Sequence, residues 1–199
     1  YKPNRKSSIL KKGELYLCDS GGQYYGGTTD ITRTIYLGDK PPETLKLIYT
    51  KVLLGHLNIS MLKFPAGTKG YQLDSIARYN LWNHGLDYNH GTGHGVGSFL
   101  GVHEGPQSIS KNPNNVSLKP GMIISNEPGF YKNKSFGIRI ENLVLVKKSS
   151  FKNYFEFETL SLFPYELKLI NFSLLSRAQK DWMRQYHNQV YVKLSNLLD

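Results

Sequence analysis

Two segments of the chain repeat apolar residues every three or four positions, the spacing that places side chains on one face of an α-helix. The first segment begins after Pro41-Pro42, and we expect its helix to end before Pro65. The second spans 71–83 and is followed by Gly85, a residue type that often ends helices. The expected buried faces hold Leu45, Ile48, Tyr49, Val52, His56 and Ile59 in the first helix, and Leu73, Ile76, Ala77 and Leu81 in the second.

Four segments have the composition of β-strands, with apolar or β-branched residues bounded by turn residues. Glycine pairs at 21–22 and 26–27 indicate turns or close approaches of the backbone. The last strand segment is apolar except at Arg139, Glu141 and Asn142, and polar residues in a buried strand need compensating contacts. The predicted strands cover 14–18, 28–37, 122–126 and 137–146.

A third helix is predicted at the carboxyl end of the chain. Ser176 and Gln179 have the spacing of a capping box, in which each side chain bonds to the backbone of the other residue. After them, large side chains recur every four residues, which predicts one buried helix face. These side chains are Trp182, Tyr186, Val190 and Leu194.

Composition narrows the class of protein. The 199 residues are 39% hydrophobic, enough for one domain with a substantial core, and no apolar run is long enough for a transmembrane helix. The formal net charge is +10, but no basic run exceeds two residues, so we expect neither nucleic acid nor a membrane surface as partner. The single cysteine, Cys18, has no disulfide partner within the chain, which favours a reducing compartment and a place in the core.

Four carboxylates occur in settings that are unusual for a solvated surface. Asp19 follows an apolar segment, Asp30 lies within a threonine-rich strand, and Glu127 and Glu141 lie at or inside predicted strands. Each of them alone is most simply a solvated or ion-paired residue. Together with His94, however, they form a donor set of oxygens and one imidazole that suits a pair of Mn²⁺, Zn²⁺ or Co²⁺ ions.

Such a paired site would explain how four carboxylates could converge on one point. Two divalent ions neutralise their mutual repulsion, and ions about 3.5–4 Å apart can share a hydroxide that is nucleophilic near neutral pH. The sequence therefore predicts a dinuclear metal site capable of attacking a carbonyl group. A thiolate site is excluded because the chain has one cysteine.

A glycine-rich segment at 91–105 surrounds two of three histidines that we single out as functional. The glycines make a long helix there improbable, so His90 and His94 are not expected to act as a helical ligand pair. We interpret His94 as a ligand, His90 as a group that either supports a metal ligand or contacts substrate, and His103 as a donor to a substrate carbonyl or oxyanion. The alternative for His90 and His103 is a purely structural hydrogen-bonding role.

The ordered motifs that carry these residues resemble those of cytosolic Xaa-Pro aminopeptidases, the aminopeptidase P family. The resemblance covers essentially the whole chain. The motifs are DSGGQY at 19–24, GTTDITRT at 27–34, HGTGHGVG at 90–97, VHEGP at 102–106, NEPG at 126–129 and RIEN at 139–142.

The resemblance implies an α+β pita-bread fold, a curved mixed or antiparallel sheet flanked by helices and incomplete at the amino end. Residues 1–165 would form most of the catalytic domain and 166–199 a helical extension. The family has two preceding domains and a further active-site histidine before the position of Tyr1. We therefore expect an amino-terminal segment of the same polypeptide as a partner.

The resemblance also assigns roles to the candidate residues. Asp19 would bind one metal ion, Asp30 and Glu141 would bridge two, and His94 and Glu127 would bind the second. The catalytic residues would be His90, His103 and Glu127, with both of these histidines also contacting substrate. Mn²⁺ is the metal that the family suggests, with Zn²⁺ and Co²⁺ as alternatives.

The implied activity is hydrolysis of the peptide bond between an amino-terminal residue and a penultimate proline, by a cytoplasmic homodimer. A prolidase, which cleaves X-Pro dipeptides, is one alternative. A non-catalytic peptide-binding module on the same fold, as in some histone chaperones, is another. Such modules typically lose metal ligands, whereas all five candidates are present here.

Overall fold

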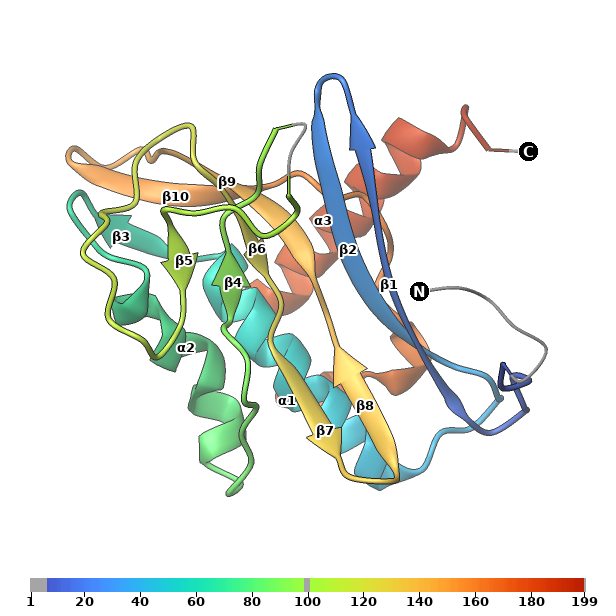
Figure 1. Ribbon diagram of the computed structural model, residues 1–199. Coiled ribbons are helices and arrows are strands. Elements are labelled where there is room, and N and C mark those ends of the chain that lie inside the picture. The colour runs from blue at the N-terminus through green and yellow to red at the C-terminus, as the bar shows by residue number, and fades with distance from the viewer. Residues whose placement is uncertain (1–6, 99–100, 199) are drawn as a thin grey trace.

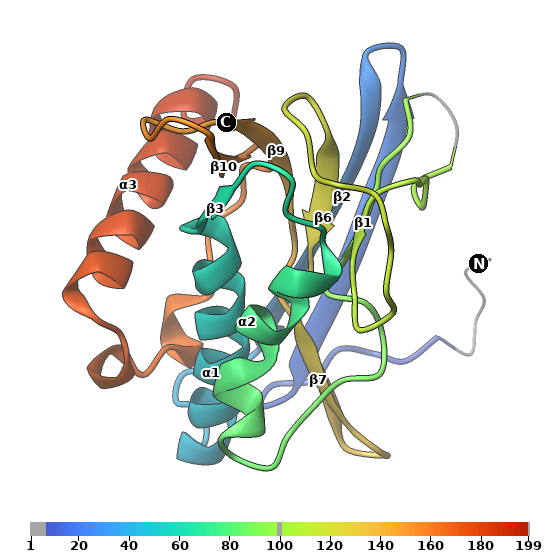
Figure 2. The same cartoon turned by 90° about the vertical axis from the view of Figure 1, so that its left-hand side faces the viewer.

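The computed structural model describes residues 7–98 and 101–198 of the chain. Its α+β architecture has antiparallel pairing throughout the described residues, with the helices on one side of the long β1–β2 hairpin (Figures 1 and 2). The strands are β1 (Leu15–Tyr24), β2 (Gly27–Tyr36), β3 (Lys63–Pro65), β4 (Gly93–His94), β5 (Ser108–Ile109), β6 (Ile123–Asn126), β7 (Gly129–Lys132), β8 (Phe136–Arg139), β9 (Asn142–Lys148) and β10 (Tyr154–Thr159). The helices are α1 (Glu43–Ser60), α2 (Tyr71–Trp82) and α3 (Arg177–Leu194), with 3₁₀ turns η1 (Leu167–Leu169) and η2 (Phe172–Leu174).

Strands β1 and β2 form one long hairpin, which explains how two aspartates eleven residues apart can act together. The register pairs Asp19 with Thr32 and Gly21 with Asp30. Because alternate residues of a strand point to the same face, Asp19, Thr32 and Asp30 project from one face of the hairpin. Cys18 lies on the opposite face and is only partly buried, so the prediction that it is a core residue is wrong.

A four-stranded sheet with the order β3-β10-β9-β6 lies beside the hairpin. Two isolated bridges attach other segments to this sheet: Thr32 of β2 pairs with Glu141, and Gly95, which follows β4, pairs with Ile124 of β6. The first bridge brings the hairpin to the start of β9, and the second brings β4 to β6. These long-range pairings position every strand that carries a candidate ligand.

The predicted continuous strand at 137–146 is interrupted in the structure. It divides into β8 and β9, with Ile140 and Glu141 between them. The reason is a change of partner: the Ile140 amide donates to the Pro128 carbonyl, and the Glu141 amide donates to the Thr32 carbonyl. The interruption places the Glu141 side chain at the junction of the hairpin and the sheet.

The three predicted helices are confirmed. The capping box of α3 is formed in both directions, by Ser176 and Gln179. Residues from α3 pack with residues from α1 in the larger hydrophobic core, and His56 lies fully buried on the α1 face. No helix in the described part of the chain is long and apolar enough to cross a membrane. Core residues shared by these two helices include Tyr49, Leu53, Leu57, Met183, Tyr186 and Val190.

Candidate metal centre

Three of the predicted ligands meet at the junction between the hairpin and the four-stranded sheet. One ligand atom from each of Asp30, His94 and Glu141 lies within 4.8 Å of the other two. Asp30 Oδ2 is 3.4 Å from His94 Nε2. Asp30 and Glu141 are only 7% and 2% exposed, so their carboxyl groups form a buried floor for this site.

Glu127 joins the group through His94. Its Oε1 atom lies 3.2 Å from His94 Nε2. Ser125 connects the two residues, because its hydroxyl accepts from the His94 amide at 2.9 Å and donates to Glu127 Oε1 at 3.0 Å. The Glu127 amide donates to the Thr92 carbonyl at 2.8 Å, which holds the end of β6 against the His94 segment.

The glycines on either side of His94 are required by close packing. A Cβ atom at Gly93 would lie 1.9 Å from the Ser125 carbonyl oxygen, and one at Gly95 would lie 2.0 Å from the Glu104 carbonyl oxygen. No side chain fits at these distances. Gly93 therefore allows β4 to approach β6 closely enough for His94 to reach Glu127. Gly95 allows the segment around Glu104 to pack against the other side of His94.

The electrostatics of this cluster favour a cation. Burial, followed by the charges of Glu127 and Asp30, raises the pKa of Glu141 to about 8. Burial lowers the pKa of His94, but hydrogen bonds to Asp30 and Glu127 more than offset this effect and raise it to about 10. Without a metal ion, protons on Glu141 and His94 therefore offset negative charge in the cluster near pH 7, and a divalent ion would take their place.

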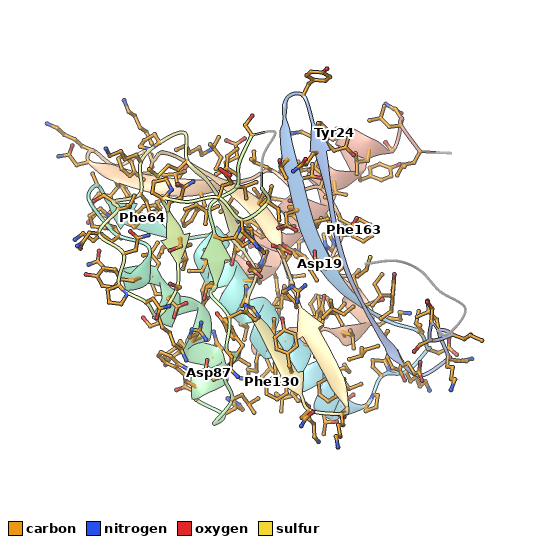
Figure 3. All side chains as sticks on the ribbon, viewed as in Figure 1. Asp19, Tyr24, Phe64, Asp87, Phe130 and Phe163 are labelled. Atoms are coloured by element: carbon orange, nitrogen blue, oxygen red, sulfur yellow. The ribbon has the colours of Figure 1, made fainter. Side chains whose placement is uncertain are left out.

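Thr32 and Arg139 connect the floor to the edge of the cleft. The Thr32 hydroxyl donates to Glu141 Oε2 at 2.5 Å and accepts from Arg139 Nε at 3.1 Å. Arg139 Nη2 also donates to Asp19 Oδ2 at 2.5 Å, and the Asp19 side chain is 48% exposed. Asp19, labelled on the hairpin in Figure 3, thus lies at the edge of the cleft.

His90 and His103 lie at the rim. The His90 Nε2 atom is 2.8 Å from the Tyr131 hydroxyl, and its Nδ1 atom is 2.8 Å from the Gly91 carbonyl oxygen. The exposed His103 ring stands edge-on to the His94 ring, with centroids 4.2 Å apart. One cleft of about 430 Å³ is lined both by candidate metal ligands and by the two rim histidines. Its lining residues are Asp19, His90, Gly91, Gly93, His94, His103, Glu127 and Arg139.

The structure thus brings all seven predicted site residues into or beside one cleft, and their chemistry fits divalent metal ions. Carboxylate oxygens with one imidazole suit Mn²⁺, Zn²⁺ or Co²⁺. The prediction omitted Thr32, Ser125, Tyr131 and the role of Arg139. Arg139 had a detectable signal, a charge inside a largely apolar strand, whereas the other three carry no pattern that distinguishes them from ordinary polar residues.

Comparison with known proteins identifies the family. The model for metallopeptidase family M24 matches residues 1–148. The chain belongs to this family. A second model, for the C-terminal region of M24 peptidases, matches residues 153–199. The family assignment made from the motifs is therefore confirmed, and so is the α+β pita-bread fold class.

Individual M24 relatives are similar over the whole chain. The probable Xaa-Pro aminopeptidase P of Coprinopsis cinerea is 49% identical over 207 residues, which cover 100% of this chain and 33% of the relative. Aminopeptidase P2 of Arabidopsis thaliana is also 49% identical, with coverage of 100% and 29%. The chain thus spans about a third of the length of these curated relatives.

Solved structures of M24 proteins are also similar to this chain. An X-prolyl aminopeptidase from Caenorhabditis elegans, described as a cytosolic enzyme with a di-nuclear active site, superposes with a TM-score of 0.93 at 40% identity. The match covers 100% of this chain and 33% of that one. A prolidase from Pyrococcus horikoshii OT3 has a TM-score of 0.68 at 36% identity, covering 80% of this chain and 43% of that one.

Proposed function

We propose that this chain is the catalytic part of a dinuclear-metal Xaa-Pro aminopeptidase, which removes the first residue from peptides with a penultimate proline. The observation that carries the proposal is the cluster of Asp30, His94 and Glu141 within 4.8 Å, on the fold of family M24. The similarity to Xaa-Pro aminopeptidase P proteins over the whole chain supports the substrate class.

The proposed site holds two divalent ions, with Mn²⁺ preferred over Zn²⁺ or Co²⁺. Asp19 would hold one ion, Asp30 and Glu141 would be shared by both, and His94 and Glu127 would hold the other. When bound, the ions neutralise the carboxylates and supply the nucleophile for hydrolysis. The raised pKa of the buried Glu141 carboxyl group, which lies close to Asp30 and His94, supports this assignment, because cations would stabilise its charged form.

The chain's own residues orient the peptide and move protons. Burial lowers the pKa of His90, so its ring is neutral near pH 7, with Nδ1 donating to the Gly91 carbonyl and Nε2 accepting from Tyr131. In this proposal His90 contacts the peptide from the cleft wall. His103 projects from the rim and donates to the carbonyl oxygen of the scissile bond. Glu127 acts as a proton carrier as well as a ligand.

We further propose that the enzyme is cytoplasmic, that residues 166–199 form an extension to a catalytic domain at 1–165, and that the chain functions with an amino-terminal segment in a homodimer. The relative described as a cytosolic enzyme supports the first point. The partner segment is supported by β1, which pairs only with β2 among the described residues and so has a second edge available to another strand.

The experiment compares matched peptides of the types X-Pro-Y, X-Ala-Y and X-Pro with the full natural protein. We expect cleavage before proline in X-Pro-Y, slow cleavage of X-Ala-Y, loss of activity with a chelator and recovery with Mn²⁺. Cleavage confined to X-Pro dipeptides would indicate a prolidase. Peptide binding without hydrolysis, whatever metal is added, would favour the non-catalytic module.

A further inference from the structure

Arg33 is a buried cation directly behind the floor of the metal centre. It lies three residues after Asp30 on β2 and points to the opposite face of the strand from Asp30 and Thr32. Only 4% of the residue is exposed, and no carboxylate forms an ion pair with it in the described part of the chain. A buried charge needs compensation, so its neutral partners determine what it does.

One side of the guanidinium group holds β2, which carries Asp30, beside the segment between β8 and β9 that carries Glu141. Nη1 donates to the Thr32 carbonyl at 2.9 Å and to the Glu141 carbonyl at 2.6 Å. Nη2 donates to Asn142 Oδ1 at 2.8 Å. Through these bonds Arg33 holds β2 against the segment that contains Glu141, on the face of β2 opposite Asp30. This segment lies between β8 and β9, so continuous strand pairing does not join it to β2.

The other side of the group binds the carboxyl-terminal part of the chain. Nη2 donates to the Phe163 carbonyl at 2.6 Å, and Nε donates to the Pro164 carbonyl at 3.1 Å. Nη2 also reaches the Tyr186 hydroxyl of α3 at 3.1 Å. Figure 3 labels Phe163, and Figure 1 shows α3 behind the hairpin.

Tyr186 makes this second attachment specific. The residue is 3% exposed, and its hydroxyl lies 2.9 Å from the Phe163 carbonyl oxygen and 3.0 Å from that of Ser161. The same hydroxyl accepts from the Phe163 amide at 3.2 Å. The segment from Ser161 to α3 thus presents a fixed set of acceptors, and the planar guanidinium fork matches acceptors on both of its sides.

We propose that Arg33 is a positioning residue through which residues 161–194 fix the separation of the Asp30 and Glu141 carboxylates for divalent ions. This inference rests on the proposed dinuclear site. A separate model for the C-terminal region of M24 peptidases matches residues 153–199 of this chain, and the contacts of Arg33 give that region a role in the metal centre.

The test must separate positioning from general stabilisation. Arg33→Lys keeps the charge but replaces the fork with a single nitrogen, which cannot reach acceptors on both sides. Tyr186→Phe keeps the ring and removes only the hydroxyl. Matched controls are Arg177→Lys, at a side chain that is 98% exposed, and Tyr191→Phe, at a residue that is 70% exposed on the same helix.

The experiment uses the full natural protein with metal removed, and titrates it with Mn²⁺ in a calorimeter at constant pH. We expect Arg33→Lys to weaken Mn²⁺ binding by about 10–100-fold, the usual scale for residues that orient metal ligands, and Tyr186→Phe to weaken it by a smaller factor. Activity measured at low Mn²⁺ should fall in both variants and recover with excess Mn²⁺. Both controls should match the wild type.

A merely structural role predicts a different result. In that case the thermal midpoints of the metal-free variants fall while Mn²⁺ affinity of the folded proteins equals that of the wild type, and the proposal is wrong. If Arg33→Lys does not fold, unchanged affinity in Tyr186→Phe overturns the proposal on its own. If the wild type itself binds no Mn²⁺, the proposed function fails, and this outcome is distinct from a failure of Arg33 alone.

Discussion

The floor and the rim of the cleft are built on different principles. The floor carboxylates are both buried: Asp30 lies on the paired strand β2, and Glu141 lies between β8 and β9, held to β2 by the Thr32–Glu141 bridge. The rim histidines, His90 and His103, lie outside the strands on glycine-rich segments, and His103 is exposed. Strand pairing gives the fixed geometry that metal ligands need, whereas accessible loop positions suit contacts with an incoming peptide.

One buried arginine lies behind the floor and another behind the rim, and their positive charges are compensated in different ways. Arg78, behind the rim, pairs with Asp74 at 2.6 Å and with Asp87 at 2.7 Å, and donates to the His90 carbonyl at 2.7 Å. Arg33, behind the floor, has only neutral acceptors. Ion pairs of Arg78 with residues near it in the sequence thus hold the rim in place, whereas hydrogen bonds from Arg33 to distant segments hold the floor.

The largest effect is expected at the floor. Glu141→Gln removes the charge of a proposed bridging ligand, so we expect turnover to fall by about 10³-fold or more and one or both ions to be lost. Turnover and metal content of the purified protein measure this directly. Glu158→Gln, at a side chain that is 49% exposed, is the control and should behave as wild type.

The attachment of the rim is tested by Arg78→Met. Removing one partner of a buried ion pair leaves Asp74 and its hydrogen-bond network without a cation, which typically costs about 3–5 kcal/mol of unfolding free energy. Urea unfolding of the metal-free protein measures this loss. Arg184→Met removes an exposed arginine and should change the unfolding free energy by less than about 1 kcal/mol; an equal loss in both variants would contradict our description of the Arg78 pair.

At the rim itself, we expect catalysis to fall while the metals stay. His90→Ala and His103→Ala should each lower turnover by about 10²-fold, the scale of a positioned proton donor or oxyanion contact. Elemental analysis should find unchanged metal content in both variants. Loss of a metal ion from His90→Ala would show that the division between floor ligands and rim contacts is misplaced.

The smallest effect concerns His56, which lies beneath the floor and binds the Asn126 carbonyl and the Tyr165 hydroxyl, both at 3.0 Å. Burial, followed by the charge of Arg33, lowers the pKa of His56 to about 3. Between this pH and about 6.5 the unfolded chain binds a proton that the native protein does not, so stability falls as pH falls through this window.

From pH 7 to pH 5 this group should cost the wild type about 2 kcal/mol of unfolding free energy. His56→Gln should lose that part of the pH dependence, whereas His84→Gln, at an exposed residue, should retain it. Urea unfolding of the metal-free proteins at the two pH values provides the comparison. Identical pH dependence in wild type and His56→Gln would contradict the assignment of a neutral buried ring.

Local patterns were sufficient to predict the helices and the family. The capping box at Ser176 and Gln179, and the apolar periodicity of α1, depend on neighbours within four residues. The motifs around Asp30 and His94 likewise identified family M24. The metal and catalytic roles assigned to individual residues stay predictions, although the structure gathers those residues around one cleft.

Contacts between distant segments could not be predicted in the same way. The break at Ile140 and Glu141 follows from a bridge to Thr32, 109 residues earlier in the sequence. The contact between Arg33 and Tyr186 spans 153 residues. Such pairings depend on the closure of the whole fold, and no periodicity in either segment encodes them. Thr32 and Arg33 therefore resemble ordinary strand residues until the strands are assembled.

The most direct test of the dinuclear site is anomalous X-ray scattering from crystals of the full natural protein grown with Mn²⁺. We expect two manganese peaks about 3.5–4 Å apart. Both should contact Asp30 and Glu141, one should also contact Asp19, and the other His94 and Glu127. A single peak at this position, or manganese bound only elsewhere, would contradict the proposed dinuclear site.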